Sequence, residues 1–262
     1  MSLALFPNPY SPLLVGAMMT RHKSKRLWAA GLLLVLLLLG GCDGCTLIST
    51  TLEYDRMTGT TYPPDQTVAG TTYNLTVIFT TAGKLLIVNE DDTNITALAG
   101  DFITEAELDA LESANRSSPV GSTTTEDAVK YYLYGIVVDH YYEASDGTQY
   151  TTVMGIMWAD DRRAFANYYK NSTISGDPGK YLRSAAHEVG HGFNMHHSDG
   201  DGSTTIMNQT SVVGNTYTYT FSSTSQGHLD DHPDECIYPG VGTFGDINLA
   251  HTSHGWTTTS CP

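Results

Sequence analysis

Hydrophobic residues form one long run near the start of the chain and shorter patterned segments after it. The run from Trp28 to Leu39 follows the basic stretch "RHKSKR" at 21–26. It is shorter than the roughly 20 residues that a membrane-spanning helix needs. A basic head before a short apolar region is typical of an export signal. We therefore assign residues 1–41 to a signal peptide and expect the remainder to be exported.

The segment after the signal lacks hydrophobic periodicity. Residues 42–70 are rich in Thr, Gly and Pro, a composition that favours a flexible linker. Residues 71–262 contain the patterned segments, and no internal repeat divides them. A length of 262 residues fits one domain with a sizeable core. We expect 42–70 to be a tether and 71–262 to fold as that domain.

Within 71–262 the patterns predict strands alternating with helices. Strand-like segments occupy 72–81, 84–89, 148–159 and 216–221, whereas helical spacing covers 104–116, 178–193 and 223–232. Thr104 followed by Glu107 matches a capping box, Pro178 suits a helix start, and Ser222 suits a helix cap. Residues 124–135 fit a helix, but 131–142 fit a strand equally well. This order of elements predicts an α+β domain.

The charge balance changes when the signal is removed. Residues 1–42 contain four of the 13 Lys and Arg and none of the 28 Asp and Glu, which leaves a net charge of −19. Nucleic-acid binding needs a basic surface, so we expect no nucleic-acid partner. The same negative charge argues against electrostatic attachment to anionic lipid. The sequence also has neither a Gly-rich phosphate loop after a strand nor a Gly-x-Ser-x-Gly elbow.

The histidines concentrate in "HEVGHGFNMHH" at 187–197. His187 and His191 are four residues apart, so both lie on one face of the predicted helix. Two imidazoles in that arrangement can share a zinc ion. Glu188, beside the first imidazole, can accept a proton from a water activated by the metal. The His-Glu-x-x-His pattern therefore predicts a zinc site with a general base.

A catalytic zinc ion needs a third protein ligand and one open position. His197 follows His191 by six residues, which requires the helix to end between them. Gly192 and Asn194 are poor helix residues, and Asn tolerates the left-handed conformation that ends helices. His196 is adjacent but offset by one residue. We prefer His197 as the third ligand.

These residues resemble the metzincin metallopeptidase signature, HExxHxxGxxH, with Asn194 in place of its glycine. The resemblance implies that His187, His191 and His197 bind zinc and that Met207 forms the Met-turn beneath it. It further implies a twisted mixed sheet with an antiparallel edge strand, an active-site helix and a C-terminal helix. Residues 151–160 occupy the position where such enzymes pair an edge strand with an extended substrate.

The end of the apolar run, Leu39-Gly40-Gly41-Cys42, resembles the lipobox of bacterial lipoproteins. This resemblance implies cleavage before Cys42, attachment of lipid to it, and a location at the bacterial cell envelope. An uncleaved signal anchor is the alternative. In an exported chain Cys236 and Cys261 could form a disulfide, whereas Cys45 has no evident partner.

Other residues that could bind metal match known binding motifs less well than the histidine cluster does. Asp199 and Asp201 in "DGDG" suit calcium, although too few ligands are in register for a full binding loop. His228 and His232 are again four apart, and packing roles are the preferred interpretation. Glu235 could replace His197 as third ligand in a related class of zinc peptidases. Tyr217 and Tyr219 are candidates for a tyrosine that assists at the zinc.

The sequence thus predicts a zinc-dependent endopeptidase with Glu188 as general base. A protein or peptide is the expected substrate, and the lipid anchor is the expected attachment to the membrane. One alternative is a non-catalytic zinc-containing surface lipoprotein for binding or adhesion. Another is a peptidase-like enzyme with a single dedicated substrate.

Overall fold

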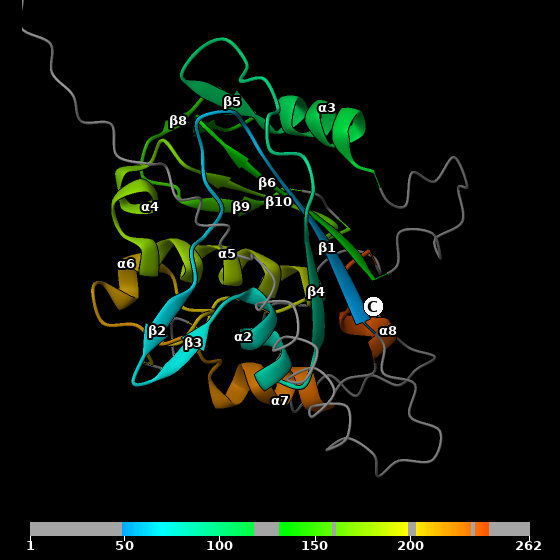
Figure 1. Ribbon diagram of the computed structural model, residues 1–262, viewed down its shortest axis with the longest axis vertical. Helices are drawn as coiled ribbons and strands as arrows, with labels where there is room; N and C mark the ends of the chain where they lie inside the picture. Colours follow the sequence, from blue (N-terminus) through cyan, green and yellow to red (C-terminus); the bar gives the residue numbers. More distant parts are fainter. Residues whose placement is uncertain (1–48, 118–130, 159–160, 199–202, 232–233, 241–262) are drawn as a thin grey trace, which may run out of the picture. The chain divides into compact units, whose positions relative to one another are not determined.

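A five-stranded mixed sheet forms the centre of the protein. The computed structural model describes residues 49–117, 131–158, 161–198, 203–231 and 234–240 (Figure 1). The strand order is β4 (Leu85–Glu90), β1 (Ser49–Arg56), β6 (Tyr132–Val138), β10 (Ala164–Tyr168) and β9 (Gly155–Met157). The first four strands pair in parallel, and β9 runs antiparallel to β10 at the edge. The predicted α+β class and the antiparallel edge strand are confirmed.

Two small sheets and several helices surround this centre. One sheet pairs β2 (Gln66–Val68) with β3 (Thr71–Tyr73), and the other has the order β5 (Phe102–Thr104), β7 (Tyr141–Glu143), β8 (Gln149–Tyr150). The helices are α2 (Leu75–Thr81), α3 (Glu105–Asn115), α4 (Ser172–Gly176), α5 (Pro178–Gly192), α6 (Thr210–Val213), α7 (Ser223–Asp231) and α8 (Asp234–Ile237).

Side-chain alternation along β6 divides the core between the two faces of the sheet. Leu133 and Val137 belong to the apolar cluster that includes side chains of α2, α5 and α7. Tyr134, Ile136 and Val138 point the other way, into a cluster that includes α3. Helices therefore cover both faces, as Figure 1 shows. This explains why β6 and β10 are apolar almost throughout, since parallel strands are buried on both sides.

Helix α5 packs against β9 and β10 at the antiparallel edge of the sheet (Figure 1). All but three of its residues are buried. The segment of the chain with the histidine cluster is therefore fixed beside an edge strand.

Three predicted helix starts are confirmed. The amide of Glu107 donates to Oγ1 of Thr104 at 3.3 Å, and the Thr104 amide donates to Oε2 of Glu107 at 2.9 Å, which completes the capping box. Pro178 opens α5. Ser222 caps α7 by accepting from the Ser225 amide at 3.1 Å. Between the alternatives for residues 131–142, the strand is correct.

The tether prediction is wrong for residues 49–68. Strand β1 lies between β4 and β6, and β2 follows it. The threonines that suggested a linker are β-branched and suit strands. Leu52 and Tyr54 alternate into the core with a period of two. Residues 42–48 and the predicted signal, 1–41, lie outside the described residues.

The strand predicted at 72–81 is mostly helix α2. Its run of Thr, Val, Ile and Phe favours a strand locally, yet Leu75, Ile78 and Phe79 bury one face at helical spacing. Asn74 caps the helix by accepting from the Val77 amide at 2.9 Å. Packing of that face against the core outweighs the local preference.

Two further strand predictions need correction. Residues 148–159 form two short strands, β8 and β9, which belong to different sheets. Residues 216–221 contain no strand, although two backbone hydrogen bonds connect them to residues 204–206.

Several predicted features lie wholly or partly outside the described residues. Lipidation of Cys42 and a calcium site at Asp199 and Asp201 are among them. Cys236 is buried and disulfide-bonded, but Cys261 is not described, so their pairing stays a prediction. Within the described part of the chain, no helix has the length and apolar character needed to cross a membrane.

The core around β6 depends on the absence of a side chain at Gly135. A Cβ there would lie 2.6 Å from Cζ of Phe165 and 2.8 Å from Cδ2 of Tyr54. We expect Gly135→Ala to lower the free energy of unfolding by about 1–3 kcal/mol through overpacking, measured by denaturant unfolding. Gly176→Ala is the matched control, because a Cβ added at Gly176 would have no atom within 4 Å. Equal stability of the two variants would contradict this account of the core.

Candidate metal centre

The helix that carries the first two histidines has a well-defined start. Asp177 precedes α5, and its Oδ1 accepts from the amides of Gly179 at 3.0 Å and Lys180 at 3.1 Å. Pro178 then occupies the first helical turn, where its missing N–H costs nothing. Since the helix is buried along most of its length, the direction of each histidine is fixed by packing.

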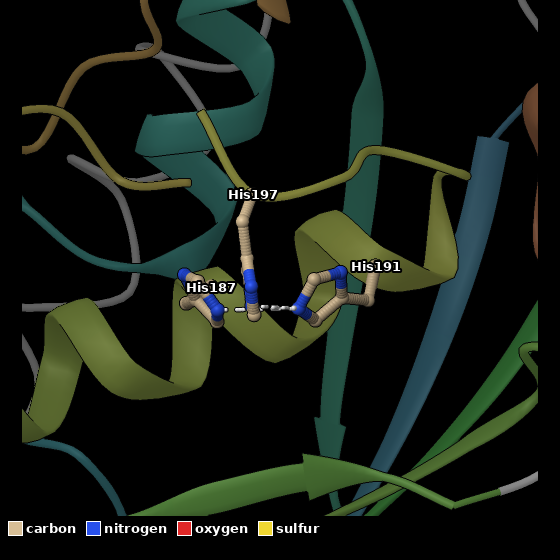
Figure 2. Close-up of side chains that lie close together, drawn as sticks. All are labelled: His187, His191 and His197. Carbon is tan, nitrogen blue, oxygen red and sulfur yellow. Dashed lines mark hydrogen bonds between the residues drawn. The ribbon is translucent and has the colours of Figure 1, made fainter. Parts of the chain in front are cut away.

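Three imidazoles converge at the end of this helix. Nε2 of His191 lies 3.1 Å from Nε2 of His187 and 3.2 Å from Nε2 of His197 (Figure 2). Ligands of a tetrahedral zinc ion bound through nitrogen are separated by about 3.3 Å. Figure 2 shows His187 and His191 on the helix and His197 on the chain that returns over it. The structure thus brings together the three histidines that the sequence selects.

Backbone carbonyls orient the first two rings. Nδ1 of His187 donates to the carbonyl of Ile206 at 2.7 Å, and Nδ1 of His191 donates to the carbonyl of Met195 at 2.7 Å. A carbonyl can only accept, so each ring has its proton on Nδ1 and a lone pair on Nε2. The two Nε2 lone pairs face each other, an arrangement that a cation between them stabilises. Such carbonyl partners are typical of histidines that bind metal.

Burial keeps these two rings neutral, as metal binding requires. The pKa of His187 lies well below its usual value, first because of burial and then because of His191 nearby. Burial, followed by the proximity of His197, lowers the pKa of His191 to about 3. Both imidazole rings are therefore neutral at physiological pH, and each can donate a nitrogen lone pair to a metal ion.

The backbone hydrogen bonds that end α5 also help to position the ring of His191. Asn194 has a φ of 59°, the left-handed conformation predicted for it. The Met195 amide donates to the Gly190 carbonyl at 3.1 Å, and the Asn194 amide donates to the His191 carbonyl at 2.9 Å. This is a Schellman ending with Asn194 in the usual glycine position. It also presents the Met195 carbonyl to the ring of His191.

The turn around Met207 connects two of the three histidines. Met207 is fully buried and packs against Gly190 of α5, where a side chain larger than hydrogen would collide with its sulfur. The adjacent Ile206 carbonyl accepts from His187, and the Met207 carbonyl accepts from the amide of Ser198 at 3.1 Å. Met207 therefore lies in a buried turn that packs against α5, and its role as the Met-turn of a zinc site stays a prediction.

Arg183 is a residue that sequence reasoning missed. Its buried guanidinium donates to the carbonyls of Thr205, at 2.9 Å, and Asn208, and to Oγ1 of Thr210 at 3.1 Å. It thereby fixes the turn that presents the Ile206 carbonyl to His187. Arg183 lies four residues before His187 and so on the same helix face, which is the signal that could have revealed it.

The carboxyl group of Glu188, a residue of α5, lies against the edge strand β9. Glu188 is 5% exposed, and burial raises its pKa to about 8, although a hydrogen bond from the Met157 amide opposes this. A Cβ on Gly155 would lie 2.7 Å from Oε1 of Glu188. The missing side chain in β9 therefore gives the carboxyl group its space. A dication at the histidines would favour the carboxylate form.

These groups open onto a cavity of about 830 Å³. One wall is the segment 152–157, which includes β9, and another is the segment 209–211. The three histidines, Glu188, His196 and Arg183 line the same cavity. The edge strand and the candidate metal ligands thus share one cavity, whereas pairing of residues 151–160 with a substrate stays a prediction.

The other candidate residues lie elsewhere or contribute differently. His196 lines the cavity but is not part of the three-histidine group. Nε2 of His228 is 3.2 Å from the Phe193 carbonyl in the core, a packing role, while His232 and the side chain of Glu235 are not described. The hydroxyls of Tyr217 and Tyr219 bond to Asp177 and Gly179 at the start of α5. They therefore lie at the end of the helix away from the histidines.

The donor set fits a borderline metal ion. His187, His191 and His197 could together bind one ion, since their ligand atoms lie within 4.8 Å of one another. Imidazole ligands suit zinc, copper, iron and nickel better than calcium or magnesium. Three nitrogen donors beside a cavity leave room for a fourth, exchangeable ligand, which is the pattern of catalytic zinc sites.

We expect single changes of His187, His191 or His197 to Ala to weaken zinc binding by more than about 100-fold. Losing a ligand costs more than losing one of its supporting hydrogen bonds, which alone costs about 10- to 100-fold. Competition with a coloured chelator measures the affinity. His196→Ala is the matched control and should bind zinc like the wild type. Loss of binding in that variant, with normal binding by His197→Ala, would reverse the assignment of the third ligand.

The left-handed residue at the helix end gives a second prediction. We expect Asn194→Ala to be less stable than Asn194→Gly by about 1 kcal/mol, because only glycine adopts this conformation without strain. Zinc affinity should follow the same order, since the Met195 carbonyl orients His191. Unfolding and chelator titrations of both variants test this. Identical behaviour would show that the helix ending does not control the ligand.

Comparison with known proteins identifies no family for this chain. No family model matches it, and no curated protein does. Among solved structures, it is similar to a zinc-dependent peptidase from Methanocorpusculum labreanum (strain Z), with 12% identity and a TM-score of 0.45 over 69% of this chain and 100% of the other. At this identity and TM-score, the likeness assigns no function to this chain.

Proposed function

We propose that this chain is a zinc-dependent endopeptidase. The observation that carries the proposal is the convergence of three histidine Nε2 atoms in a cavity that also contains a buried carboxyl group. His187, His191 and His197 would hold the metal. When bound there, zinc supplies Lewis acidity that polarises a carbonyl and makes a water molecule acidic.

Glu188 is the proposed general base. Its carboxylate accepts a proton from the attacking water, whose oxygen forms a bond to the carbonyl carbon of the substrate. The same carboxyl group then gives that proton to the leaving nitrogen as the C–N bond breaks. A group that alternates between these forms needs a pKa near the working pH. Burial, which disfavours the charged form of Glu188, moves its pKa in that direction.

Edge strand β9 is the proposed binding surface for the substrate backbone. An extended peptide can add to the exposed edge of a sheet through main-chain hydrogen bonds. β9 is the last strand of the central sheet, and the Met157 amide bonds to Glu188. A peptide aligned along 152–157 would therefore pass directly over the carboxyl group, with chain continuing in both directions. This favours internal peptide bonds as substrates.

The alternative is a zinc-containing surface lipoprotein for binding or adhesion. A structural zinc site is closed by four protein ligands and needs no base beside it. The buried Glu188 and the cavity favour the enzyme. For both functions we propose export and attachment at the cell envelope through lipid on Cys42, on the basis of the signal and lipobox-like sequence.

The experiment that tests the proposal is the substitution Glu188→Gln. It keeps the size of the side chain but removes the base. We expect zinc content to remain at the wild-type level while peptide cleavage falls by at least about 100-fold. A diverse peptide library, analysed by mass spectrometry, measures cleavage and also locates the broken bonds. Wild-type cleavage by this variant would refute the mechanism.

A matched control separates the base from general damage to the cavity. Val212→Ala changes an exposed residue directly after the cavity wall at 209–211 and should cleave like the wild type. Zinc bound by the wild type with no cleavage of any library peptide would favour the binding protein or an enzyme with one dedicated substrate.

A further inference from the structure

The third histidine is held differently from the other two. His187 and His191 are buried or half-buried, and backbone carbonyls orient both rings. His197 is exposed, and its Nδ1 lies 2.7 Å from Nε2 of Gln209. A side chain, supplied from twelve residues further along the chain, therefore orients the ligand that packing restrains least.

An amide differs from a carbonyl in what it can accept or donate. A carbonyl oxygen only accepts, so it fixes the proton of a histidine on Nδ1. The side-chain amide of Gln209 has a nitrogen that donates hydrogen bonds and an oxygen that accepts them. Rotation of the amide group by half a turn exchanges the positions of these two atoms. With the nitrogen toward Nδ1, the proton of His197 is on Nε2. With the oxygen toward Nδ1, the proton moves to Nδ1 and Nε2 presents a lone pair.

We infer that Gln209 is a positioning residue that sets the orientation and tautomer of His197 for metal binding. The inference rests on the proposed metal site. In the metal-bound state the Gln209 oxygen accepts from Nδ1 of His197. In the metal-free state the amide supports the other tautomer, whose Nε2 proton points at Nε2 of His191, 3.2 Å away. Gln209 thus exchanges its bond as metal enters or leaves.

The local structure gives independent support for this role. Gln209 is the N-cap residue of α6, yet its side chain makes no capping bond. Ser, Thr, Asp and Asn are the residues that cap helices well. Capping of α6 therefore does not explain why residue 209 is a glutamine, whereas the hydrogen bond to His197 does.

Gln209 also belongs to the wall of the cavity. Gln209, Thr210 and Ser211 line it together with the histidines. A ligand that contacts this wall is therefore one side chain away from His197. Binding of a molecule in the cavity is therefore connected, through the side chain of Gln209, to the orientation of His197.

Two substitutions of Gln209 separate the bond from the shape of the side chain. Gln209→Met keeps the length but cannot bond to Nδ1, and we expect it to weaken zinc binding by about 10- to 100-fold. Gln209→Glu can only accept, which fixes the metal-ready tautomer, and it should bind zinc at least as tightly as the wild type. Chelator competition on the full chain measures all three affinities.

Controls exclude charge and folding as explanations. Ser211→Glu adds the same negative charge on the same wall, without placing it at Nδ1. Affinity in Gln209→Glu should therefore exceed that of Ser211→Glu. Denaturant unfolding of the metal-free proteins should show Gln209→Met as stable as the wild type, because the bond serves the ligand and not the helix.

A spectroscopic measurement reports the tautomer directly. The ¹⁵N shifts of the His197 ring should show the proton on Nδ1 in zinc-loaded wild type and in metal-free Gln209→Glu, but on Nε2 in metal-free wild type. Wild-type affinity in Gln209→Met, or the same tautomer of His197 in both wild-type states, would overturn the inference. Failure of the wild type itself to bind zinc would instead refute the proposed function.

Discussion

The site depends on hydrogen bonds that connect the ligand rings to the ends and turns of the backbone. Two carbonyls, of Ile206 and Met195, fix the protons of His187 and His191 on Nδ1, so that both lone pairs point to one place. Each carbonyl comes from a feature with its own structural cause. Met195 follows the left-handed residue that ends α5, and Ile206 lies in the turn that packs Met207 under the helix. The geometry of the candidate metal centre therefore depends on how α5 ends and on the turn that packs against it.

The sheet gives this centre its surroundings. Parallel strands buried on both faces create a rigid base for α5, and the antiparallel β9 closes one side of the cavity. Gly155 leaves space at this edge for Glu188, which the Met157 amide contacts. Arg183, which also lines the cavity, fixes the turn at 205–210 through hydrogen bonds to Thr205 and Thr210. The proposed base, the three histidines and the edge strand are thus held by different parts of the structure, and all of them line one cavity.

The sequence predicts the centre of the site better than it predicts the fold. The helix at 178–193, its ending at Asn194 and the three histidines follow from local rules of spacing and capping. The predictions for β1 and α2 are wrong because packing across the sheet decides the state of both segments, where Leu52 and Ile78 become buried. Arg183 and Gln209 act through contacts with residues 12 or more positions away. Such contacts depend on the turn between them, which no local pattern describes.

The central claim is that three histidines hold a zinc ion and leave one position open. X-ray absorption at the zinc edge of the purified, zinc-loaded chain tests it most directly. The account predicts three imidazole nitrogens at about 2.0–2.1 Å with the multiple-scattering pattern of histidine, and one further light-atom ligand. That ligand should be displaced when a hydroxamate is added. A closed shell of four protein ligands, or sulfur among them, would contradict the account.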